Sequence, residues 1–399
     1  MLGSVRSTAP SASLPQPAGG QALAVAQASR DRDVRALGAA GRQQPPEPHD
    51  GLPARLQDVL SAAAPASAIE PGDLLRDLVS AGLNLLSLPA SGNTLARWRL
   101  FAAVAGVDLS AIKLVEGHTD ALAILAELDG PPPPAGSLWA TWAAEPPSAR
   151  VEARSGPDDG VLLTGTKAWC SGAAAVTHAV VSAWNAEGEP VLAAVALDQP
   201  GVTVTHRGWH AVGMEATSSV DVDFAQARAR WVGTPGQYVG RPGFWHGGAG
   251  IAACWYGGAC ALADAVRQAC GNAVQRHRGS TSAAVSPALS FRLAHLGAID
   301  VALGQTAALL REAANWIDAH PSQDAMAVAL RVRASAEAAA TRVLDHAGRA
   351  LGATPYCRDP RYARMAADLP VFIRQSHAEQ DLAALARTQL DAAEGTWGL

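Results

Sequence analysis

Several features that mark particular protein classes are scarce in this sequence of 399 residues. It has only five Cys, far apart at positions 170, 254, 260, 270 and 357, and none forms a C-x-x-C pair. This odd number and wide spacing argue against a disulfide framework or a structural zinc site, and fit a reducing cytoplasm. Phe and Tyr are also few, five and four, although 49% of the residues are hydrophobic. The sequence therefore favours close-packed, Ala-rich helices over a large aromatic core.

An excess of basic residues is lacking as well. The formal net charge is −5, which argues against nucleic acid or an anionic membrane surface as the main partner. No continuous apolar segment follows Arg6, so a secretory signal is not expected. The most apolar helix expected, residues 247–266, contains five Gly and is interpreted as a buried core helix rather than a membrane span. We expect a cytoplasmic protein.

The composition divides the chain into four segments. Residues 1–52 are rich in Ala, Ser, Pro, Gly and Gln and are predicted to be a disordered tail, because they bury too little to offset their ordering entropy. Residues 53–134 carry helical apolar patterns and end in four consecutive prolines, a stiff connector. Residues 135–238 contain short strand-like runs at a spacing typical of an antiparallel barrel or sandwich.

Residues 239–399 return to helical patterns. Long helices with short connections predict an antiparallel four-helix bundle. The helices expected are 247–275, 287–320, 323–351 and 368–389. The fold class predicted is therefore α+β, with a helical domain, a middle β domain and a C-terminal bundle.

One turn within the β segment carries a chemical signal. In VLLTGTKAWCSGAAA, residues 161–175, an apolar strand leads to Trp169 and Ser171, with Gly172 beside them. A flat aromatic ring and a hydroxyl two residues apart suit a planar, hydrogen-bonding ligand. An ordinary hairpin with a core Trp gives the same local pattern, so both interpretations stay open on these residues alone.

The order of the segments resembles that of acyl-CoA dehydrogenases and their flavoprotein relatives. LLTGTKAWCSGA (162–173) resembles the family segment NGxKxWITNG, and PGVTVTHRGWHAVGMEATSSVDVDF (200–224) resembles PGxxxxxxxxKxGxRxSxTxxxxF. PRYARMAAD (360–368) is similar to part of GGxGYxxxxPxxRxxRD. The resemblance extends over about residues 55–390 and implies FAD between the β domain and the bundle.

Carried over residue by residue, the resemblance implies that Trp169 packs against the flavin and that Ser171 takes the place of a Thr at its edge. Two flavin contacts depart from the family pattern. Ala144 stands where the TExxxGSD loop has a hydroxyl. Arg276 and Arg278 stand in place of Arg-x-x-Phe-Gly, which holds FAD phosphate across a subunit interface. The resemblance also implies a homodimer or homotetramer.

The activity implied is α,β-dehydrogenation of an acyl-CoA or other acyl thioester, which needs a carboxylate base in a dry site. Counting from Asp368, Ser376 falls at the place of the family's Glu, and the alternative place, 247–249, has no carboxylate either. Glu379, His377 and His246 are the candidate replacements. Each has an ordinary alternative: Glu379 as a solvated or capping residue, His377 as a structural residue, and His246 as a group that caps or packs at a helix start.

Three hypotheses follow. The first is an FAD-dependent oxidoreductase resembling acyl-CoA dehydrogenases, acting in fatty-acid or specialised acyl metabolism. The second is a flavin-dependent monooxygenase or oxidase on the same fold, because His beside flavin is used by oxygen-activating relatives. The third is a non-catalytic homologue that keeps the fold as a binding module.

Overall fold

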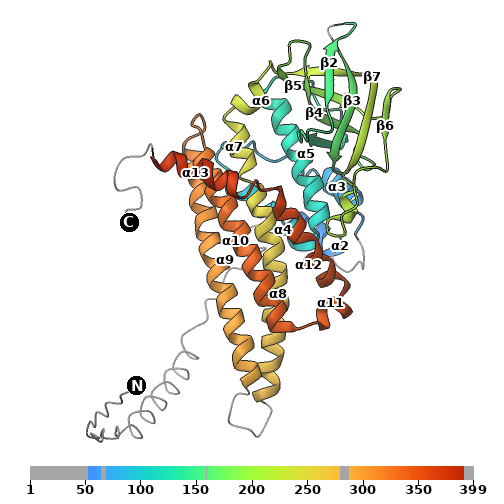
Figure 1. The fold of residues 1–399 in the computed structure, drawn as a ribbon. Helices are drawn as coiled ribbons and strands as arrows, with labels where there is room; N and C mark the ends of the chain where they lie inside the picture. Colours follow the sequence, from blue (N-terminus) through green and yellow to red (C-terminus); the bar gives the residue numbers. More distant parts are fainter. Residues whose placement is uncertain (1–52, 64–68, 159, 279–286, 391–399) are drawn as a thin grey trace, which may run out of the picture. The chain divides into compact units, whose positions relative to one another are not determined.

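The helices and strands follow one another in the order expected from the sequence (Figure 1). The computed structural model describes residues 53–63, 69–158, 160–278 and 287–390. The tail predicted to be disordered, residues 1–52, lies outside the described residues. The described residues form one compact unit, and the division of this unit into domains at residues 134 and 238 stays a prediction.

The first helices lead to a long helix that begins directly after Asp108. They are α2 (Ala54–Ala63), α3 (Pro71–Ser80), α4 (Thr94–Val107) and α5 (Leu109–Glu127). The Asp108 carboxylate accepts a hydrogen bond from the Ala111 amide at 2.7 Å and so caps α5. The amide and hydroxyl of Thr94, at the start of α4, donate to the Asp318 carboxylate instead. Asp318, 224 positions away in the sequence, thus provides the hydrogen-bond acceptor for the first residue of α4.

The strands form one seven-stranded sheet. They are β1 (Trp139–Trp142), β2 (Val151–Ser155), β3 (Val161–Cys170), β4 (His178–Trp184), β5 (Pro190–Ala196), β6 (Val202–Val204) and β7 (Val220–Val232). The order is β1-β4-β2-β3-β7-β5, and an additional β4–β5 pairing closes it into a barrel-like ring. The expectation of a purely antiparallel sheet is wrong, because β4 pairs with β1 and β2 in parallel. Along the chain β4 comes after β1 and β2, and it runs in the same direction as both.

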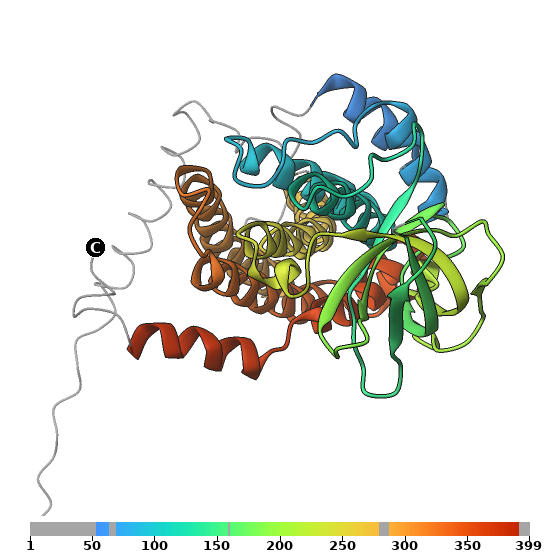
Figure 2. The same cartoon turned by 90° about the horizontal axis from the view of Figure 1, so that it is seen from above.

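The C-terminal half is helical. Its elements are α6 (Gln237–Gly240), α7 (Gly243–Gly248), α8 (Ile251–Arg278), α9 (Pro287–Ala319), α10 (Met326–Leu351), α11 (Thr354–Arg358), α12 (Pro360–Phe372) and α13 (Glu379–Leu390). Figure 2 shows the long helices α8, α9 and α10 close to end-on, beside the strands. Two expected helices have different bounds. The expected helix 247–275 is interrupted between α7 and α8. The expected helix 368–389 is instead the end of α12 and most of α13, separated by residues 373–378.

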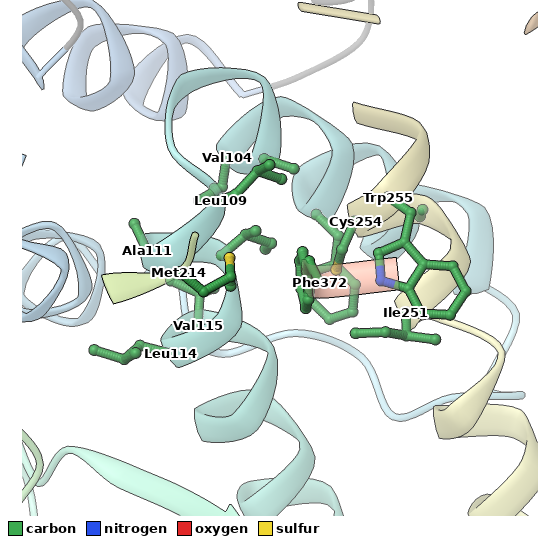
Figure 3. Packing of buried hydrophobic residues seen from close by; sticks show 14 of the residues in the cluster. Val104, Leu109, Ala111, Leu114, Val115, Met214, Ile251, Cys254, Trp255 and Phe372 are labelled. Atoms are coloured by element: carbon green, nitrogen blue, oxygen red, sulfur yellow. The ribbon is translucent and has the colours of Figure 1, made fainter. Parts of the chain in front are cut away.

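The Ala-rich composition produces close helix packing, as expected. A Cβ on Gly257 of α8 would lie 2.2 Å from the Ala102 carbonyl oxygen of α4, so only glycine permits this approach. One core then extends through the helices and the sheet: Leu109 and Val115 of α5, Met214, Trp255 of α8 and Phe372 of α12 all belong to it (Figure 3). The bundle and the strands therefore share buried contacts around α5.

Two helical stretches are long and apolar enough to cross a membrane by length and composition alone. In Gly243–Arg278, 72% of the most apolar window is buried inside the protein, whereas in Pro287–Ala319 the figure is 22%. Buried core helices of soluble proteins pass the same criterion. The expectation of no membrane partner therefore stays a prediction.

Candidate functional site

The turn that ends β3 has an unusual backbone. Trp169 has φ of 57°, in the left-handed region, and the register of β3 against β7 shifts between Lys167 and Cys170. Trp169 is 53% exposed, so it is not the core Trp of an ordinary hairpin. A bulky residue at positive φ is strained, and such strain is commonly found at functional sites. Gly172 follows with φ of 71°, and a Cβ there would lie 2.8 Å from the Leu114 side chain of α5.

A chain of hydroxyl groups supports Ser171 beside this turn. Ser171 Oγ lies 2.8 Å from Ser219 Oγ, which lies 2.8 Å from Thr217 Oγ1. Thr217 donates to the Met214 carbonyl oxygen at 2.8 Å. Each hydroxyl has one proton, so Thr217 must accept from Ser219, and Ser219 must accept from Ser171. Ser171 Oγ therefore keeps its lone pairs for a ligand and has no proton to offer while the chain is intact.

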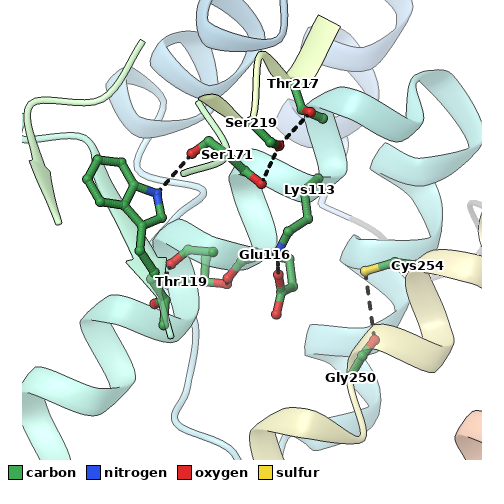
Figure 4. Close-up of polar contacts among 11 residues, drawn as sticks. Lys113, Glu116, Thr119, Ser171, Thr217, Ser219, Gly250 and Cys254 are labelled. Carbon is green, nitrogen blue, oxygen red and sulfur yellow. Dashed lines mark hydrogen bonds and ion pairs between the residues drawn. The ribbon is translucent and has the colours of Figure 1, made fainter. Parts of the chain in front are cut away.

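Three charged residues of α5 face the bundle close to this turn. Lys113, Glu116 and Asp120 are three and four positions apart, which places them on one side of the helix. We call them the α5 charged face. Their side chains keep 17%, 17% and 22% of their surface exposed, although α5 is otherwise largely buried. Figure 4 shows Lys113 and Glu116 between the Ser171–Ser219 pair and Cys254 of α8.

Charges from neighbouring elements surround the α5 charged face. Lys113 Nζ donates to Glu116 at 2.8 Å. Burial alone would lower the pKa of Lys113, but the charge and hydrogen bond of Glu116 outweigh it and raise this pKa. Burial, and then the charge of Glu116, raise the pKa of Asp120. The positive charges of Arg241, Arg97 and Lys113 lower this pKa, but they do not outweigh the first two effects. The nearest cation to Asp120 in the described residues is Arg241, whose Nη2 lies 3.9 Å from Oδ1.

The candidate bases from the sequence do not gather into one site. The His377 side chain is 72% exposed, with Nδ1 3.6 Å from Asp381. Glu379 is exposed at the first position of α13, and Ser376 Oγ accepts a hydrogen bond from the Ala378 amide. His246 is buried at 2% exposure, and burial lowers its pKa, so its imidazole is neutral at pH 7. These positions fit the ordinary structural alternatives for His377 and Glu379.

The expected phosphate ligands lie far from the turn. Arg276 and Arg278 are exposed near the end of α8. At 1.5 Å of rise per residue, Arg276 lies roughly 33 Å along the helix from Cys254. Within one chain these arginines therefore cannot contact a flavin ring at Trp169. Ala144 is half-buried in the loop after β1 and offers no side-chain hydrogen bond, while the adjacent Glu145 is engaged by Lys167, Ser182 and Trp184.

Sequence reasoning missed the α5 charged face. Its only signal was the spacing Lys113, Glu116, Asp120 within an otherwise apolar helix. The sequence pointed to Trp169 and Ser171, and the structure places both at the end of β3, while their role stays a prediction. A planar ligand fits there in two respects: the indole is exposed rather than buried, and the Ser171 lone pairs are free to accept.

Comparison with solved structures identifies the fold. The chain matches TdsC, a dibenzothiophene monooxygenase of Paenibacillus sp. A11-2 solved with FMN and indole, with 19% identity and a TM-score of 0.67 over 84% of this chain and 97% of that one. The chain has an acyl-CoA dehydrogenase-like fold. The details of the domain layout beyond this likeness stay predictions.

Two further structures have the same fold. KijD3, solved with FMN and dTDP-3-amino-2,3,6-trideoxy-4-keto-3-methyl-D-glucose, matches with 20% identity and a TM-score of 0.68, over 88% of this chain and 95% of that one. The methanesulfinate monooxygenase MsuC of Pseudomonas fluorescens matches with 18% identity and a TM-score of 0.64, over 85% and 97%. No protein-family model and no curated protein sequence matches the chain.

Proposed function

We propose that this protein is a flavin-dependent monooxygenase that acts on a small polar substrate. The observation that carries this proposal is the α5 charged face beside the Ser171 turn. Charged groups held partly out of water strongly favour polar partners, because an apolar partner would leave them without compensation. Lys113, Glu116 and Asp120 thus make a poor wall for an acyl chain and a good one for a molecule with hydrogen-bonding groups.

The alternative of acyl-thioester dehydrogenation has less support. That reaction needs a carboxylate over the substrate, and the residue at the family place is Ser376, whose hydroxyl is engaged with the Ala378 amide. The neighbouring candidates His377 and Glu379 are exposed. The similar solved structures also favour oxygen chemistry, since they include a dibenzothiophene monooxygenase and a methanesulfinate monooxygenase.

For the cofactor we propose FMN rather than FAD. Two of the similar structures hold FMN, and this supports the choice. Trp169 would stack on the ring, and Ser171 Oγ would accept a hydrogen bond from a ring N–H. A bound flavin supplies the electrons and the reaction with oxygen, and the α5 charged face would orient the substrate and move its protons.

The similar proteins were solved with indole and with a dTDP-amino sugar, respectively. Both molecules carry N–H groups on a compact ring. We propose a substrate with a proton-bearing nitrogen or oxygen for this chain, since the α5 charged face offers both an acidic and a basic hydrogen-bonding partner. A homodimer or homotetramer and a cytoplasmic location remain part of the proposal.

The proposal is tested on purified protein loaded with FMN. Anaerobic addition of a panel of acyl-CoA thioesters is expected to leave the flavin absorbance unchanged. Chemically reduced, protein-bound FMN exposed to air is expected to produce hydrogen peroxide in the absence of substrate. Bleaching by an acyl-CoA would support dehydrogenation instead. A protein that takes up neither FMN nor FAD would support the non-catalytic hypothesis.

A further inference from the structure

A cavity of about 290 Å³ lies on the β sheet, where β5 runs between β4 and β7. Two small residues of β5 line it. Ala196 is paired with His178 of β4. Ala194 is paired with Arg230 of β7. Paired residues, and residues two apart on one strand, point to the same face of a sheet, so the two alanines leave a space between the imidazole and the arginine side of the cavity.

Among the described residues, every ionisable side chain that lines this cavity is basic. Arg228 and Arg230 come from β7, and His178 comes from β4. Within the described part of the chain, the Arg228 side chain has no hydrogen bond or ion pair. Arg230 donates one long hydrogen bond, from Nη1 to the Asp158 carbonyl oxygen at 3.4 Å. Guanidinium donors that face a cavity without a carboxylate partner favour an anionic ligand.

The opposite wall is the proline connector that follows α5. Pro131, Pro132 and Pro134 line the cavity. A proline has no N–H group and its ring fixes φ, so this wall is rigid and adds neither donor nor charge. The Trp139 ring stacks on His178 with 4.8 Å between centroids and holds the imidazole in place. The cavity therefore fits a compact ligand with an apolar body and an anionic group.

The imidazole of His178 adds a hydrogen-bond acceptor. Thr177 donates its only hydroxyl proton to the Leu138 carbonyl oxygen at 3.0 Å, so His178 Nδ1 donates to Thr177 Oγ1 at 2.8 Å. Burial lowers the pKa of His178 below 6.5, so the ring is neutral at pH 7 and Nε2 keeps its lone pair. A phosphate monoester, whose second pKa is about 6, brings a proton that Nε2 can accept.

We propose that this cavity binds a small phosphate monoester: Arg228 and Arg230 donate to the phosphate oxygens, and the phosphate O–H group donates to His178 Nε2. A sulfate ester has no such proton at neutral pH and would place a negative oxygen against the Nε2 lone pair. The site is separate from the flavin turn. Arg228 is paired with Leu162 near the start of β3, and Trp169 lies seven residues, or roughly 23 Å, further along this strand. The inference therefore goes beyond the proposed function and does not depend on it.

The test titrates the full-length protein with phenyl phosphate by isothermal calorimetry at pH 7, with and without bound FMN, in a buffer free of phosphate and sulfate. Phenyl sulfate, phenol and inorganic phosphate are the matched probes. We expect one phenyl phosphate per chain, unaffected by FMN, no binding of phenol, and roughly tenfold weaker binding of phenyl sulfate. Inorganic phosphate should also bind more weakly, because it leaves the proline wall uncovered. Equal affinities for phenyl phosphate and inorganic phosphate would overturn the assignment of an organic ester.

Four variants separate this site from a general attraction of anions to the surface. Arg228→Gln should weaken binding of phenyl phosphate by roughly tenfold or more. Ala196→Leu keeps both arginines but fills the cavity, so it should abolish binding. His178→Phe should lose most of the preference for phosphate over sulfate. Arg154→Gln, which alters an exposed arginine paired with Glu152 on β2, is the control and should bind as wild type does.

Binding that persists in Ala196→Leu would show that the cavity is not the site. Unchanged affinity in Arg228→Gln would overturn the inference as well, and this exposed substitution leaves the core intact. Circular dichroism and FMN affinity check that each variant is folded. A protein that binds phenyl phosphate but no flavin would contradict the proposed function alone.

Discussion

Ser171 donates its only hydroxyl proton to Ser219 across 2.8 Å, and this bond is the first in a chain that ends on the Met214 carbonyl oxygen. The direction of the chain follows from Thr217, whose proton is committed to a backbone acceptor. Ser171 is therefore set as an acceptor before any ligand arrives. A flavin ring has more N–H groups when reduced than when oxidised, so an acceptor at its edge favours the reduced form.

The first prediction concerns the redox potential of the bound flavin. Ser219→Ala removes the group that takes the Ser171 proton, which leaves Ser171 free to donate to the oxidised ring. We expect the midpoint potential of bound FMN to become more negative than in wild type, as measured by anaerobic dye titration. Ser91→Ala, which removes an exposed hydroxyl in the loop before α4, is the control. Equal potentials in wild type and Ser219→Ala would show that the chain does not orient Ser171.

The second prediction concerns the strain at Trp169. Glycine adopts positive φ without penalty, so Trp169→Gly should stabilise the fold by about 1 kcal/mol while weakening FMN binding. Gln226, on β7, also has φ of 57° and provides a matched control. Gln226→Gly should increase stability and leave FMN affinity unchanged. Denaturant unfolding and flavin titration measure the two effects, and an FMN affinity undiminished in Trp169→Gly would exclude stacking on this indole.

The third prediction concerns the lysine under the turn. Lys167 is 2% exposed, pairs with Glu145, and donates to the carbonyl oxygen and hydroxyl of Ser182 at 2.9 and 2.7 Å. Lys167→Met should lower the free energy of unfolding by about 2–4 kcal/mol, because it leaves these acceptors unpaired. Arg154→Met breaks an exposed pair with Glu152 and should change the free energy of unfolding by less than about 1 kcal/mol. Similar losses in both variants would contradict a structural role for Lys167.

The fourth prediction concerns pH and stability. Asp368 accepts a hydrogen bond from the Met214 amide, and burial raises its pKa from 3.8 to about 6. The native state thus binds this proton more tightly than the unfolded chain, so its contribution to stability is lost as pH rises from about 4 to about 6. Asp368→Asn should reduce this pH dependence by on the order of 1–3 kcal/mol.

Urea unfolding at pH 5 and pH 7.5 measures this difference. Asp77→Asn, at an exposed position of α3, is the control and should retain the wild-type dependence on pH. If Asp368→Asn also retained it, the carboxylate of Asp368 would not be the group that binds the proton during folding.

Local signals in the sequence predicted much of the fold. Asp108, directly before the helical pattern, caps α5, and the turn before Gly172 carries Trp169 with its side chain exposed. These features depend on neighbours within a few positions, where backbone preferences and spacing act directly. The last helix was predicted wrongly because the helical apolar pattern continues past Phe372, although the chain turns to an extended conformation at Ser376.

The site itself depends on pairings that spacing does not reveal. Asp318 caps α4 from 224 positions away, and Glu145 meets Lys167 from 22 positions away. The surroundings of the α5 charged face are set only when α8 packs near Glu116 and α7 packs against Asp120. Long-range packing decides whether a charged helical residue lies in solvent or beside a site, and a single sequence carries little of that information.

The central claim is that a flavin binds at the Ser171 turn. The most direct measurement is a titration of wild type, Trp169→Ala and Ser171→Ala with oxidised and reduced FMN under anaerobic conditions, followed by flavin absorbance and Trp fluorescence. We predict one FMN per chain in wild type, tighter binding of the reduced form, and at least about tenfold weaker binding in Trp169→Ala, which corresponds to 1.4 kcal/mol. Wild type that binds no flavin, or binding that is equal in all three proteins, would contradict the account.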